Sequence, residues 1–322
     1  MPTRDLSSFG VTGDQLIRAA QLLREGKLVA FPTETVYGLG ANALDAAAVE
    51  RIYEAKGRPH SSPIIVHVSD FEMVKSMAAV WPEAAQTLAA KFWPGPLTLV
   101  LPKKPAVPDH VTAGLATVGV RMPAHPVALA LIEEAHIPIA APSANLFTEV
   151  SPTTAEHVRC GLGDRVDYIL DGGPCTVGIE STVLSLAEAM PVLYRPGGVS
   201  REQIEAAIGA IFSATEKPGE GHASPGLHPR HYRPRTRLLL VEDGRVPEQG
   251  SGAYVRLMHA PQHNVNEIVT MPTDAAGYAA RLYSVLHTLD ARNFDWIAID
   301  SPPPSDDWEA VLDRLRRAAF ER

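Results

Sequence analysis

The stretch that decides the fold is Leu28-Val29-Ala30-Phe31-Pro32-Thr33-Glu34-Thr35-Val36-Tyr37-Gly38-Leu39-Gly40. Its first four residues form a short apolar run, which is typical of a buried strand, and a proline ends this run. The segment that follows carries two threonine hydroxyls and a tyrosine beside two glycines, which allow a close backbone approach. Such a segment either lines a small-molecule pocket or forms a capped turn, and local chemistry leaves both readings open.

Helix-like and strand-like segments alternate on both sides of this stretch. Ahead of it, apolar residues at helical spacing from Leu16 to Leu23 predict a helix, with Asp14 as its N-cap and Gly26 beyond its end. Further helices are predicted over Ala46–Ala55 and Val127–Ala135. Interleaved strands and helices indicate an α/β fold with α+β character. The predicted strands are Leu28–Phe31, Ile64–Val68, Leu97–Leu101, Val118–Arg121, Ile137–Ala140, Tyr168–Leu170, Thr182–Leu186 and Val192–Tyr194.

The periodic pattern stops after a helix-like stretch at Arg201–Phe212. Glycine and proline then recur without apolar spacing, which predicts a linker over residues 213–236. We therefore predict a larger domain over residues 1–212 and a small, open, Rossmann-like α/β domain over residues 237–322. Its predicted elements are the strands Leu238–Val241, Ala253–Met258, Ile268–Met271 and Trp296–Ile299 and the helices Ala275–Leu289 and Trp308–Phe320.

The composition excludes several classes of protein. The chain has 322 residues, 45% hydrophobic and 20% charged, which is close to the globular average and unlike a disordered or fibrous chain. No apolar run approaches the roughly 18 residues of a membrane span, and none follows the N-terminal arginine as in a secretory signal. Two cysteines, Cys160 and Cys175, support neither a disulfide framework nor a zinc cage. We expect a cytoplasmic protein with no membrane partner.

The charge balance argues against a protein that coats nucleic acid. The net charge is −8, with 16 basic and 22 acidic residues up to residue 210 and 13 and 15 beyond it. Non-specific binding to nucleic acid depends on clustered lysine and arginine. Any site for a polyanion is therefore expected to be local.

Four cations lie near the ends of predicted helices and strands. Lys56 and Arg58 end a helix, where the helix dipole alone favours positive charge. Arg121 ends one strand and Arg195 follows another, and an arginine at a strand end is usually solvated. Taken together, the four favour a phosphate or carboxylate ligand, since lysine supplies a point charge and arginine a bidentate fork.

Two further segments carry polar groups. Ala141-Pro142-Ser143-Ala144-Asn145 follows a predicted strand, so its serine and asparagine either face one ligand or close an Asx-type turn. The linker segment 224–235 combines arginines and histidines around Tyr232, and it is either a bland linker or a lid. No Walker loop, Gly-x-Gly-x-x-Gly or His-Glu-x-x-His motif occurs, and nothing marks a Ser-His-Asp arrangement. Catalysis by positioning and charge stabilisation is therefore expected.

Seven motifs follow one another along the chain. They are Pro32–Leu39, Lys56-Gly57-Arg58, Pro94–Thr98, Arg121-Met122-Pro123, Ser143-Ala144-Asn145, Pro196-Gly197-Gly198 and a linker with Ser224-Pro225-Gly226 and His231-Tyr232-Arg233-Pro234. No single motif is specific, but their order is, and in this order they resemble the YrdC-like family. The resemblance runs through residues 12–235, and its later motifs resemble the longer, two-domain form of the family.

The resemblance implies a twisted mixed sheet around a concave, positively lined cavity. It implies an ATP-dependent nucleotidyltransferase that converts L-threonine, bicarbonate and ATP into L-threonylcarbamoyl-AMP and pyrophosphate. The product is the activated intermediate for N6-threonylcarbamoyladenosine in tRNA, so the tRNA threonylcarbamoyl-transfer machinery is an expected downstream partner. Mg²⁺ is expected with ATP, because the step brings anions together. The sequence contains no evident carboxylate cluster, so the metal ligands stay unknown.

The resemblance also implies a role for individual residues. L-Threonine would be bound by Thr35, His67, Arg121, Ala141 and Ser181. The nucleotide would be held by Arg58, Ser62, Thr117, Ser143, Ser151, Arg195 and Tyr232, the last closing over it from the linker. The residues expected to be catalytic are Lys56, Arg58, Ser143 and Asn145.

The chain departs from the family pattern at two places. Ser62 stands before Pro63 where the family usually has asparagine, and its shorter side chain reaches less far. Leu227-His228-Pro229 replaces the common Met-Lys-Tyr of the linker. Two alternative functions stay open, an RNA-binding YrdC-like module with weak RNA affinity and another carbamoyl transferase. The acidic balance weighs against the first, and the linker motif with its trailing domain against the second.

Overall fold

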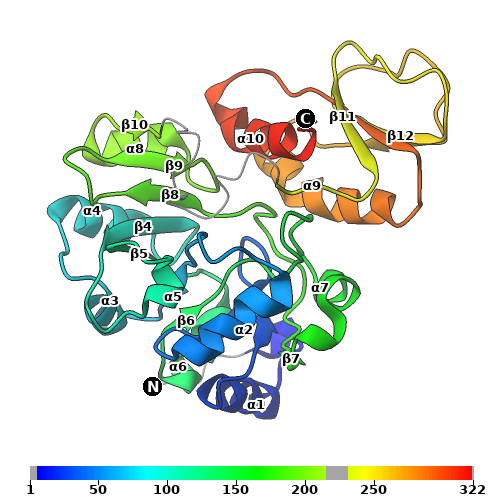
Figure 1. Ribbon diagram of the computed structural model, residues 1–322. Coiled ribbons are helices and arrows are strands. Elements are labelled where there is room, and N and C mark those ends of the chain that lie inside the picture. Colours follow the sequence, from blue (N-terminus) through cyan, green and yellow to red (C-terminus); the bar gives the residue numbers. More distant parts are fainter. Residues whose placement is uncertain (1–5, 215–230, 321–322) are drawn as a thin grey trace.

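The computed structural model describes residues 6–214 and 231–320, and they form two sheets with their helices (Figure 1). We call residues 6–214 the N-terminal unit and residues 231–320 the C-terminal unit. The linker residues 215–230, His228 among them, lie outside the described residues.

The N-terminal unit contains a ten-stranded mixed sheet. Antiparallel pairs such as β1 with β2 alternate with parallel pairs such as β4 with β8 and β3 with β5. The large mixed sheet confirms the fold class predicted from the sequence. Across the sheet the order is β10 (Phe212–Ser213), β9 (Val192–Arg195), β8 (Thr182–Ser185), β4 (Leu97–Pro102), β5 (Thr117–Arg121), β3 (Val66–His67), β6 (Ile139–Ala140), β2 (Gly38–Asn42), β1 (Val29–Phe31) and β7 (Tyr168–Ile169).

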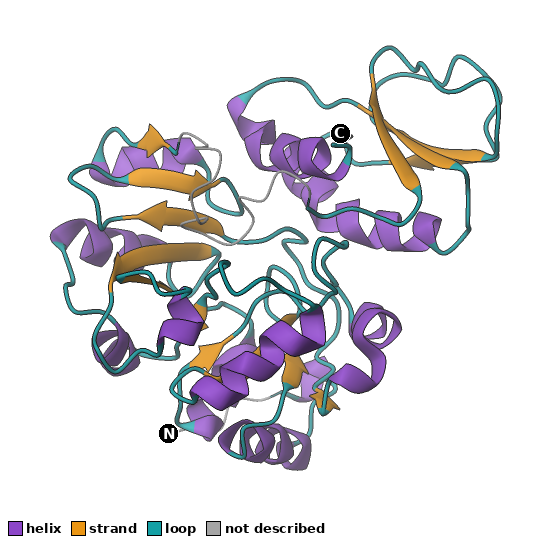
Figure 2. Cartoon of the chain, in the orientation of Figure 1, coloured by secondary structure: helices purple, strands orange, loops and turns teal. Residues whose placement is uncertain are grey.

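Helices pack on the outside of this sheet (Figure 2). Most begin at a side chain that accepts a hydrogen bond from a free backbone N–H of the first turn, as Asp45 does for α2 and Asp70 for α3. The helices are α1 (Gly13–Arg24), α2 (Ala46–Lys56), α3 (Phe71–Met77), α4 (Glu83–Phe92), α5 (Asp109–Thr112), α6 (Pro126–Ala135), α7 (Ala155–Leu162) and α8 (Arg201–Ile208), with short 3₁₀ turns at Ser7–Phe9 and Gly163–Arg165.

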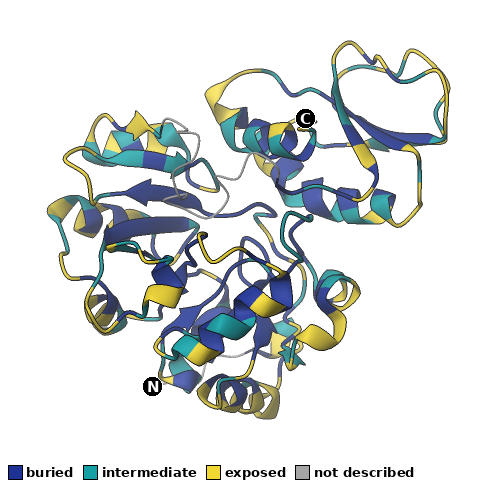
Figure 3. Cartoon of the chain, in the orientation of Figure 1, coloured by how far each residue is buried: buried dark blue, intermediate teal, exposed yellow. Residues whose placement is uncertain are grey.

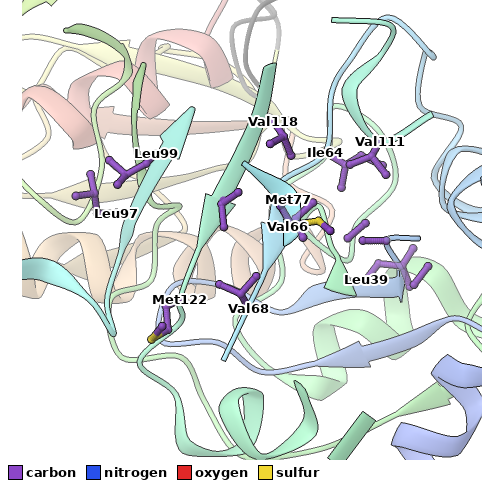
Figure 4. Close-up of a cluster of buried hydrophobic side chains, with 14 of the residues drawn as sticks. Leu39, Ile64, Val66, Val68, Met77, Leu97, Leu99, Val111, Val118 and Met122 are labelled. Atoms are coloured by element: carbon purple, nitrogen blue, oxygen red, sulfur yellow. The ribbon is translucent and has the colours of Figure 1, made fainter. Parts of the chain in front are cut away.

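The two-residue period of the strands assigns their side chains to opposite faces. In β1, Val29 and Phe31 pack in a cluster with residues of α1 and α6, whereas Ala30 belongs to the larger cluster that α2 and α4 complete. In the middle of the sheet, Leu97, Leu99, Val66, Val68 and Val118 all point into the larger cluster (Figure 4). Burying each such side chain contributes roughly 1.5–3 kcal/mol, so this core fixes the register of the strands.

The same alternation turns polar side chains to the opposite face of the sheet. His67 is the neighbour of Val66 and Val68, and Arg121 is the neighbour of Val120, so both face away from the larger core. Thr98 lies between Leu97 and Leu99 for the same reason. All three polar side chains are buried. The sequence pattern that builds the core therefore also places an arginine, a histidine and a threonine on one inner surface.

The C-terminal unit is a four-stranded, fully parallel sheet in which each strand pairs in register with its neighbour. Its helices lie on the side of this sheet that faces the N-terminal unit (Figure 1). Buried residues of these helices and of the strands form the core of the unit, and Figure 3 colours the buried segments dark blue. The elements are β11 (Arg237–Val241), β14 (Trp296–Asp300), β12 (Gly252–Arg256), β13 (Glu267–Thr270), α9 (Ala275–Asp290), a 3₁₀ turn at Asp306–Trp308 and α10 (Glu309–Ala318).

Several local predictions are wrong in detail, and among them the helix predicted to reach Phe212 ends at Ile208. The N-cap of α1 is Thr12 and not Asp14, because the Thr12 hydroxyl accepts from the Gln15 N–H and the Gln15 side chain bonds back in a capping box. The predicted strand at 64–68 is paired only at Val66–His67. Ser213, predicted to begin the linker, pairs in β10 with β9. Among the described residues, no helix is long and apolar enough to cross a membrane.

Candidate active site

A cavity lies on the polar face of the large sheet. It is lined by backbone and side chains from the loop after β1, from β3 and β5, and from the segments around residues 141–143, 180–181 and 231–232. The cavity is partly open to solvent, and the space between its walls is about 550 Å³ with that open part included. The walls include three buried arginines, Arg58, Arg121 and Arg195.

The loop after β1 is a tight hydroxyl-capped turn that opens onto the cavity. The Thr33 hydroxyl donates to the Val36 carbonyl at 2.7 Å and accepts from the N–H groups of Thr35 and Val36. The two threonine hydroxyls are 2.8 Å apart. The segment is therefore a capped turn that presents Thr35 to the cavity, and its role in binding a small molecule stays a prediction. Gly40 is required for packing, because a Cβ there would come within 2.8 Å of the Phe31 ring.

Arg121 reaches the cavity from the end of β5 and contacts this loop. Its guanidinium lies 2.7 Å from a Glu34 carboxylate oxygen and donates to the Thr35 hydroxyl at 3.0 Å. A third contact goes to the Gly95 carbonyl, so the Pro94–Thr98 motif helps to orient the arginine. A buried pair of this kind is costly to break, because the remaining partner would be an uncompensated buried charge.

The Lys56-Gly57-Arg58 motif ends α2 in a left-handed turn. Gly57 has φ of 63°, which glycine adopts without strain, and this turn separates its two cationic neighbours. Arg58 lines the cavity, and its guanidinium donates to the carbonyls of Ser62 and Pro63. Burial, followed by the charge of Arg195, lowers the pKa of Arg58 to about 10, so it stays cationic at neutral pH.

Lys56 lies behind the cavity wall. Its ammonium group donates to the backbone carbonyls of Ser143 and Asn145, and the side chain is buried. The 141–145 loop is also bound to the first loop, through Leu39 N–H to Pro142 O and Ala144 N–H to Tyr37 O, both at 2.8 Å. Lys56 therefore fixes the backbone that presents Ser143 to the cavity.

Ser181 and Arg195 form the opposite wall. Arg195 donates to the Ser181 carbonyl at 3.0–3.1 Å and lies 3.3 Å from its hydroxyl. The Ser181 hydroxyl is also 2.8 Å from that of Thr98. The Pro-Gly-Gly motif contributes directly, because a Cβ on Gly197 would come within 2.4 Å of the Ser181 backbone.

His231 and Tyr232 close the cavity from the linker side. Both are buried, and both line the cavity. Among the described residues, neither the Tyr232 hydroxyl nor His231 Nδ1 has a hydrogen-bond partner. Tyr232 has φ of 61°, a left-handed conformation that is costly for a residue with a Cβ. Its position is held by packing.

Most of the predicted site residues line the cavity, and the others lie behind its wall or in a separate pocket. Thr35, Arg58, His67, Arg121, Ala141, Ser143, Ser181, Arg195 and Tyr232 line the cavity. Lys56, Ser62, Asn145 and Ser151 do not line it. Lys56, Ser62 and Ser151 are each bonded to a residue that does, whereas Asn145 is bonded to Lys56. Thr117, at the start of β5, lines a separate small pocket that shares only Ile65 with the cavity.

Two acidic residues of the site received no role from the sequence. Glu34 pairs with Arg121, and Glu180 lines the cavity between the two units. The Glu180 carboxylate accepts from Ser151 Oγ at 2.6 Å and from Arg314 Nε at 2.9 Å. Burial raises the pKa of Glu180, but the charges of Arg314 and Arg195 outweigh it and bring the pKa to about 2. Glu34 stands inside the Pro32–Leu39 motif and Glu180 outside all of the motifs, and nothing in the sequence indicates their arginine partners.

Two family descriptions match the chain. One, "Telomere recombination", covers residues 21–197 and is the Sua5/YciO/YrdC family; the other, "Threonylcarbamoyl-AMP synthase, C-terminal domain", covers residues 199–320. The chain belongs to the threonylcarbamoyl-AMP synthase family. The matches cover both units, so the resemblance found in the motifs is confirmed.

Relatives in this family match along nearly the whole chain. The threonylcarbamoyl-AMP synthase of Bacillus subtilis is 46% identical over 96% of this chain and 94% of its own length. That of Pyrococcus abyssi is 44% identical over 94% of each chain. The crystal structure of P. abyssi Sua5 complexed with L-threonine superimposes with a TM-score of 0.87, at 42% identity over 94% of each chain. Both units thus have the fold of this family.

The buried histidine of the site predicts a pH dependence of stability. Burial, followed by the charge of Arg121, lowers the pKa of His67 from 6.5 to about 3. The unfolded chain therefore takes up this proton first as the pH falls. The stability that neutral His67 contributes is complete above pH 6.5 and is lost between pH 6.5 and about pH 3.

When the pH is lowered from about 7.5 to about 5, the free energy of unfolding should fall in both proteins. We expect this fall to be roughly 2 kcal/mol smaller in His67→Asn than in the unsubstituted protein. Thermal unfolding at the two pH values measures this difference. Glu180, which titrates below its ordinary value of 4.5, does not interfere in this range. An equal loss in both proteins would show that His67 is not buried in its neutral form.

Proposed function

We propose that this protein is an L-threonylcarbamoyladenylate synthase that converts L-threonine, bicarbonate and ATP into L-threonylcarbamoyl-AMP and pyrophosphate. The threonine amine and bicarbonate combine to an N-carboxy anion with loss of water. A carboxylate oxygen of this anion then attacks the α-phosphorus of ATP, and pyrophosphate leaves. The observation that carries the proposal is the set of three buried arginines around one cavity, in a chain related to threonylcarbamoyl-AMP synthases along its length.

The arrangement suits a reaction between anions. No step needs a protein nucleophile, so the task of the site is to bring the anions together and to stabilise the negative charge that develops on phosphate oxygens. Arg58, Arg121 and Arg195 enter the cavity from three directions, and each guanidinium is held by backbone carbonyls. Their orientation therefore needs little reorganisation during the reaction, which makes their charge more effective.

We assign the residues to the two substrates as follows. Thr35, His67, Arg121, Ala141 and Ser181 would hold L-threonine, with Arg121 paired to its carboxylate. Arg58, Ser62, Thr117, Ser143, Ser151, Arg195 and Tyr232 would hold ATP. Lys56, Arg58, Ser143 and Asn145 would serve the transfer step, Lys56 by fixing the loop that carries Ser143. The positions of Ser62, Thr117 and Ser151 outside the cavity wall make them the weakest of these assignments.

We propose that Mg²⁺ enters together with ATP. The two acids at the cavity, Glu34 and Glu180, are paired with arginines, and among the described residues no group of three or more His, Cys, Asp or Glu could hold a metal ion. Mg²⁺ readily binds through phosphate oxygens and water, where it would neutralise the charge of the triphosphate. We therefore assign no residue to it.

The product is an activated carbamoyl group, so we propose that the tRNA threonylcarbamoyl-transfer machinery consumes it. We also propose that residues 1–212 and 237–322 are the two domains, joined by a linker over residues 213–236, and that the protein is cytoplasmic. An RNA-binding role is less well supported, because the described cationic side chains of the site are buried and cannot form an extended basic face.

The test is an assay of pyrophosphate release. Purified protein is incubated with ATP, Mg²⁺ and bicarbonate, with and without L-threonine, and we expect release that depends on threonine. A matched reaction with L-serine in place of L-threonine tests whether the cavity recognises the substrate methyl group. Release that does not depend on threonine, combined with tight binding to tRNA, would exclude the synthase in favour of the RNA-binding alternative.

A further inference from the structure

The cavity wall contains a carboxylate, Glu180, whose negative charge would repel the proposed ligand ATP. Glu180 is buried and shares the cavity wall with Arg58 and Arg195. ATP carries several negative charges, so an uncompensated carboxylate at this position would repel it strongly at low dielectric. The side chain therefore needs a partner that neutralises it.

The C-terminal unit supplies this partner. Arg314 of α10 donates through Nε to the Glu180 carboxylate at 2.9 Å, and the Tyr283 hydroxyl of α9 donates to the same oxygen at 3.0 Å. The Arg314 side chain is fully buried, and its Nη1 also donates to the Pro196 carbonyl of the N-terminal unit at 2.9 Å. Both helices of the C-terminal unit thus reach residues at the edge of the cavity.

The same two residues enclose Tyr232. The Tyr283 ring stacks on the Tyr232 ring, with centroids 5.8 Å apart and an interplanar angle of 24°. The guanidinium carbon of Arg314 lies 5.2 Å from the Tyr232 ring centroid. Because Tyr232 has a left-handed backbone conformation, these contacts have to offset its strain. Contacts from the C-terminal unit therefore hold Tyr232 in the position in which it closes the cavity.

We propose that Arg314 and Tyr283 are positioning residues for the nucleotide: they neutralise Glu180 and hold Tyr232 in the cavity wall, so that the C-terminal unit sets the affinity for ATP. This inference rests on the proposed function for the identity of the ligand. It gives the C-terminal unit a defined part in the reaction. L-Threonine, which we assign to the side of the cavity around Thr35 and Arg121, should be unaffected.

The alternative is that the ion pair between Arg314 and Glu180 only holds the two units together. The two possibilities differ in the role of the Glu180 charge. If Arg314 acts by neutralising this charge, removing the charge should make Arg314 dispensable. If Arg314 acts only by packing and by its bonds to the Pro196 carbonyl and the Asp313 carboxylate, removing the Glu180 charge restores nothing.

The experiment compares Arg314→Met, the double variant Glu180→Gln/Arg314→Met, and Arg316→Met as a control. Arg316 is an exposed arginine on the same helix, so the control loses the same charge without touching Glu180. ATP binding and L-threonine binding are measured by titration calorimetry, together with kcat, KM and the thermal midpoint of each variant.

We expect Arg314→Met to weaken ATP binding by about 30-fold or more, since it leaves a buried carboxylate beside the ligand without its ion-pair partner. The double variant should return to within about fivefold of the parent, because the glutamine oxygen can accept from one of the Ser151 and Tyr283 hydroxyls while its amide group donates to the other. L-Threonine binding and the Arg316→Met control should match the parent. If Arg314→Met does not fold, recovery of folding and ATP binding in the double variant supports the same conclusion.

The inference is overturned if Arg314→Met binds ATP like the parent, or if the double variant binds ATP as weakly as Arg314→Met. Its failure is distinguishable from failure of the proposed function. A parent protein that binds ATP but releases no threonine-dependent pyrophosphate would contradict the proposed function alone, because the calorimetric comparison does not require turnover.

Discussion

Arg58→Ala is expected to lower kcat/KM for pyrophosphate release by about 10² to 10³-fold, the usual effect of removing one preorganised charge-stabilising group. Arg58 lines the cavity, and two carbonyl contacts fix the plane of its guanidinium. The planar fork can bind two phosphate oxygens at once, and alanine offers neither charge nor donors. The loss should fall mainly on ATP-dependent steps and leave L-threonine binding intact.

Two matched variants sharpen this prediction. Arg58→Lys keeps the charge but loses the fork, so its activity should lie between those of the parent and Arg58→Ala. Arg159→Ala removes an arginine that is half-exposed on α7 and should leave kcat/KM unchanged. If Arg58→Ala keeps its activity within about threefold of the parent, the cavity does not stabilise the reacting phosphate.

Lys56→Ala is expected to lower activity by about 10²-fold or more and to destabilise the protein at the same time. Its ammonium group is the donor for the Ser143 and Asn145 carbonyls, and leaving buried acceptors unpaired costs about 1–3 kcal/mol each. Without these bonds the loop that presents Ser143 should relax. Thermal unfolding and steady-state kinetics on one preparation measure both effects.

The joint loss of activity and stability distinguishes the role of Lys56 from that of Arg58. A residue that fixes a loop should weaken the use of both substrates, whereas Arg58→Ala should affect ATP alone. Lys75→Ala removes a largely exposed lysine on α3 and serves as the control for charge loss. A Lys56→Ala protein with unchanged stability and a defect confined to ATP would show that Lys56 contacts phosphate directly.

The sequence predicts much of this site because strand alternation is a local property. Once Val66, Val118 and Val120 are placed in a core, the two-residue period turns His67 and Arg121 to the other face. The order of the motifs then adds the loops that carry Thr35 and Ser143. These residues are predictable because a local pattern or a recognisable motif contains each of them.

The acids of the site are not predictable in this way. An acidic residue in a loop after a strand is exposed by default, and only a charged partner makes its burial possible. The partner of Glu34 is 87 positions away in Arg121, and that of Glu180 is 134 positions away in Arg314. Arg314 belongs to an ordinary amphipathic helix, in which nothing distinguishes it from Arg316 or Arg317. Such pairs become visible only when segments far apart in the chain are placed together in the structure.

The most direct measurement follows the bicarbonate carbon. The protein is incubated with ATP, Mg²⁺, L-threonine and ¹³C-labelled bicarbonate, and the quenched reaction is analysed by mass spectrometry. We predict a threonylcarbamoyl-AMP ion that carries one ¹³C atom, absent when threonine is omitted and strongly reduced in Arg58→Ala. Hydrolysis of ATP with no labelled adenylate would contradict the assignment of this cavity as the site of threonylcarbamoyl-AMP synthesis.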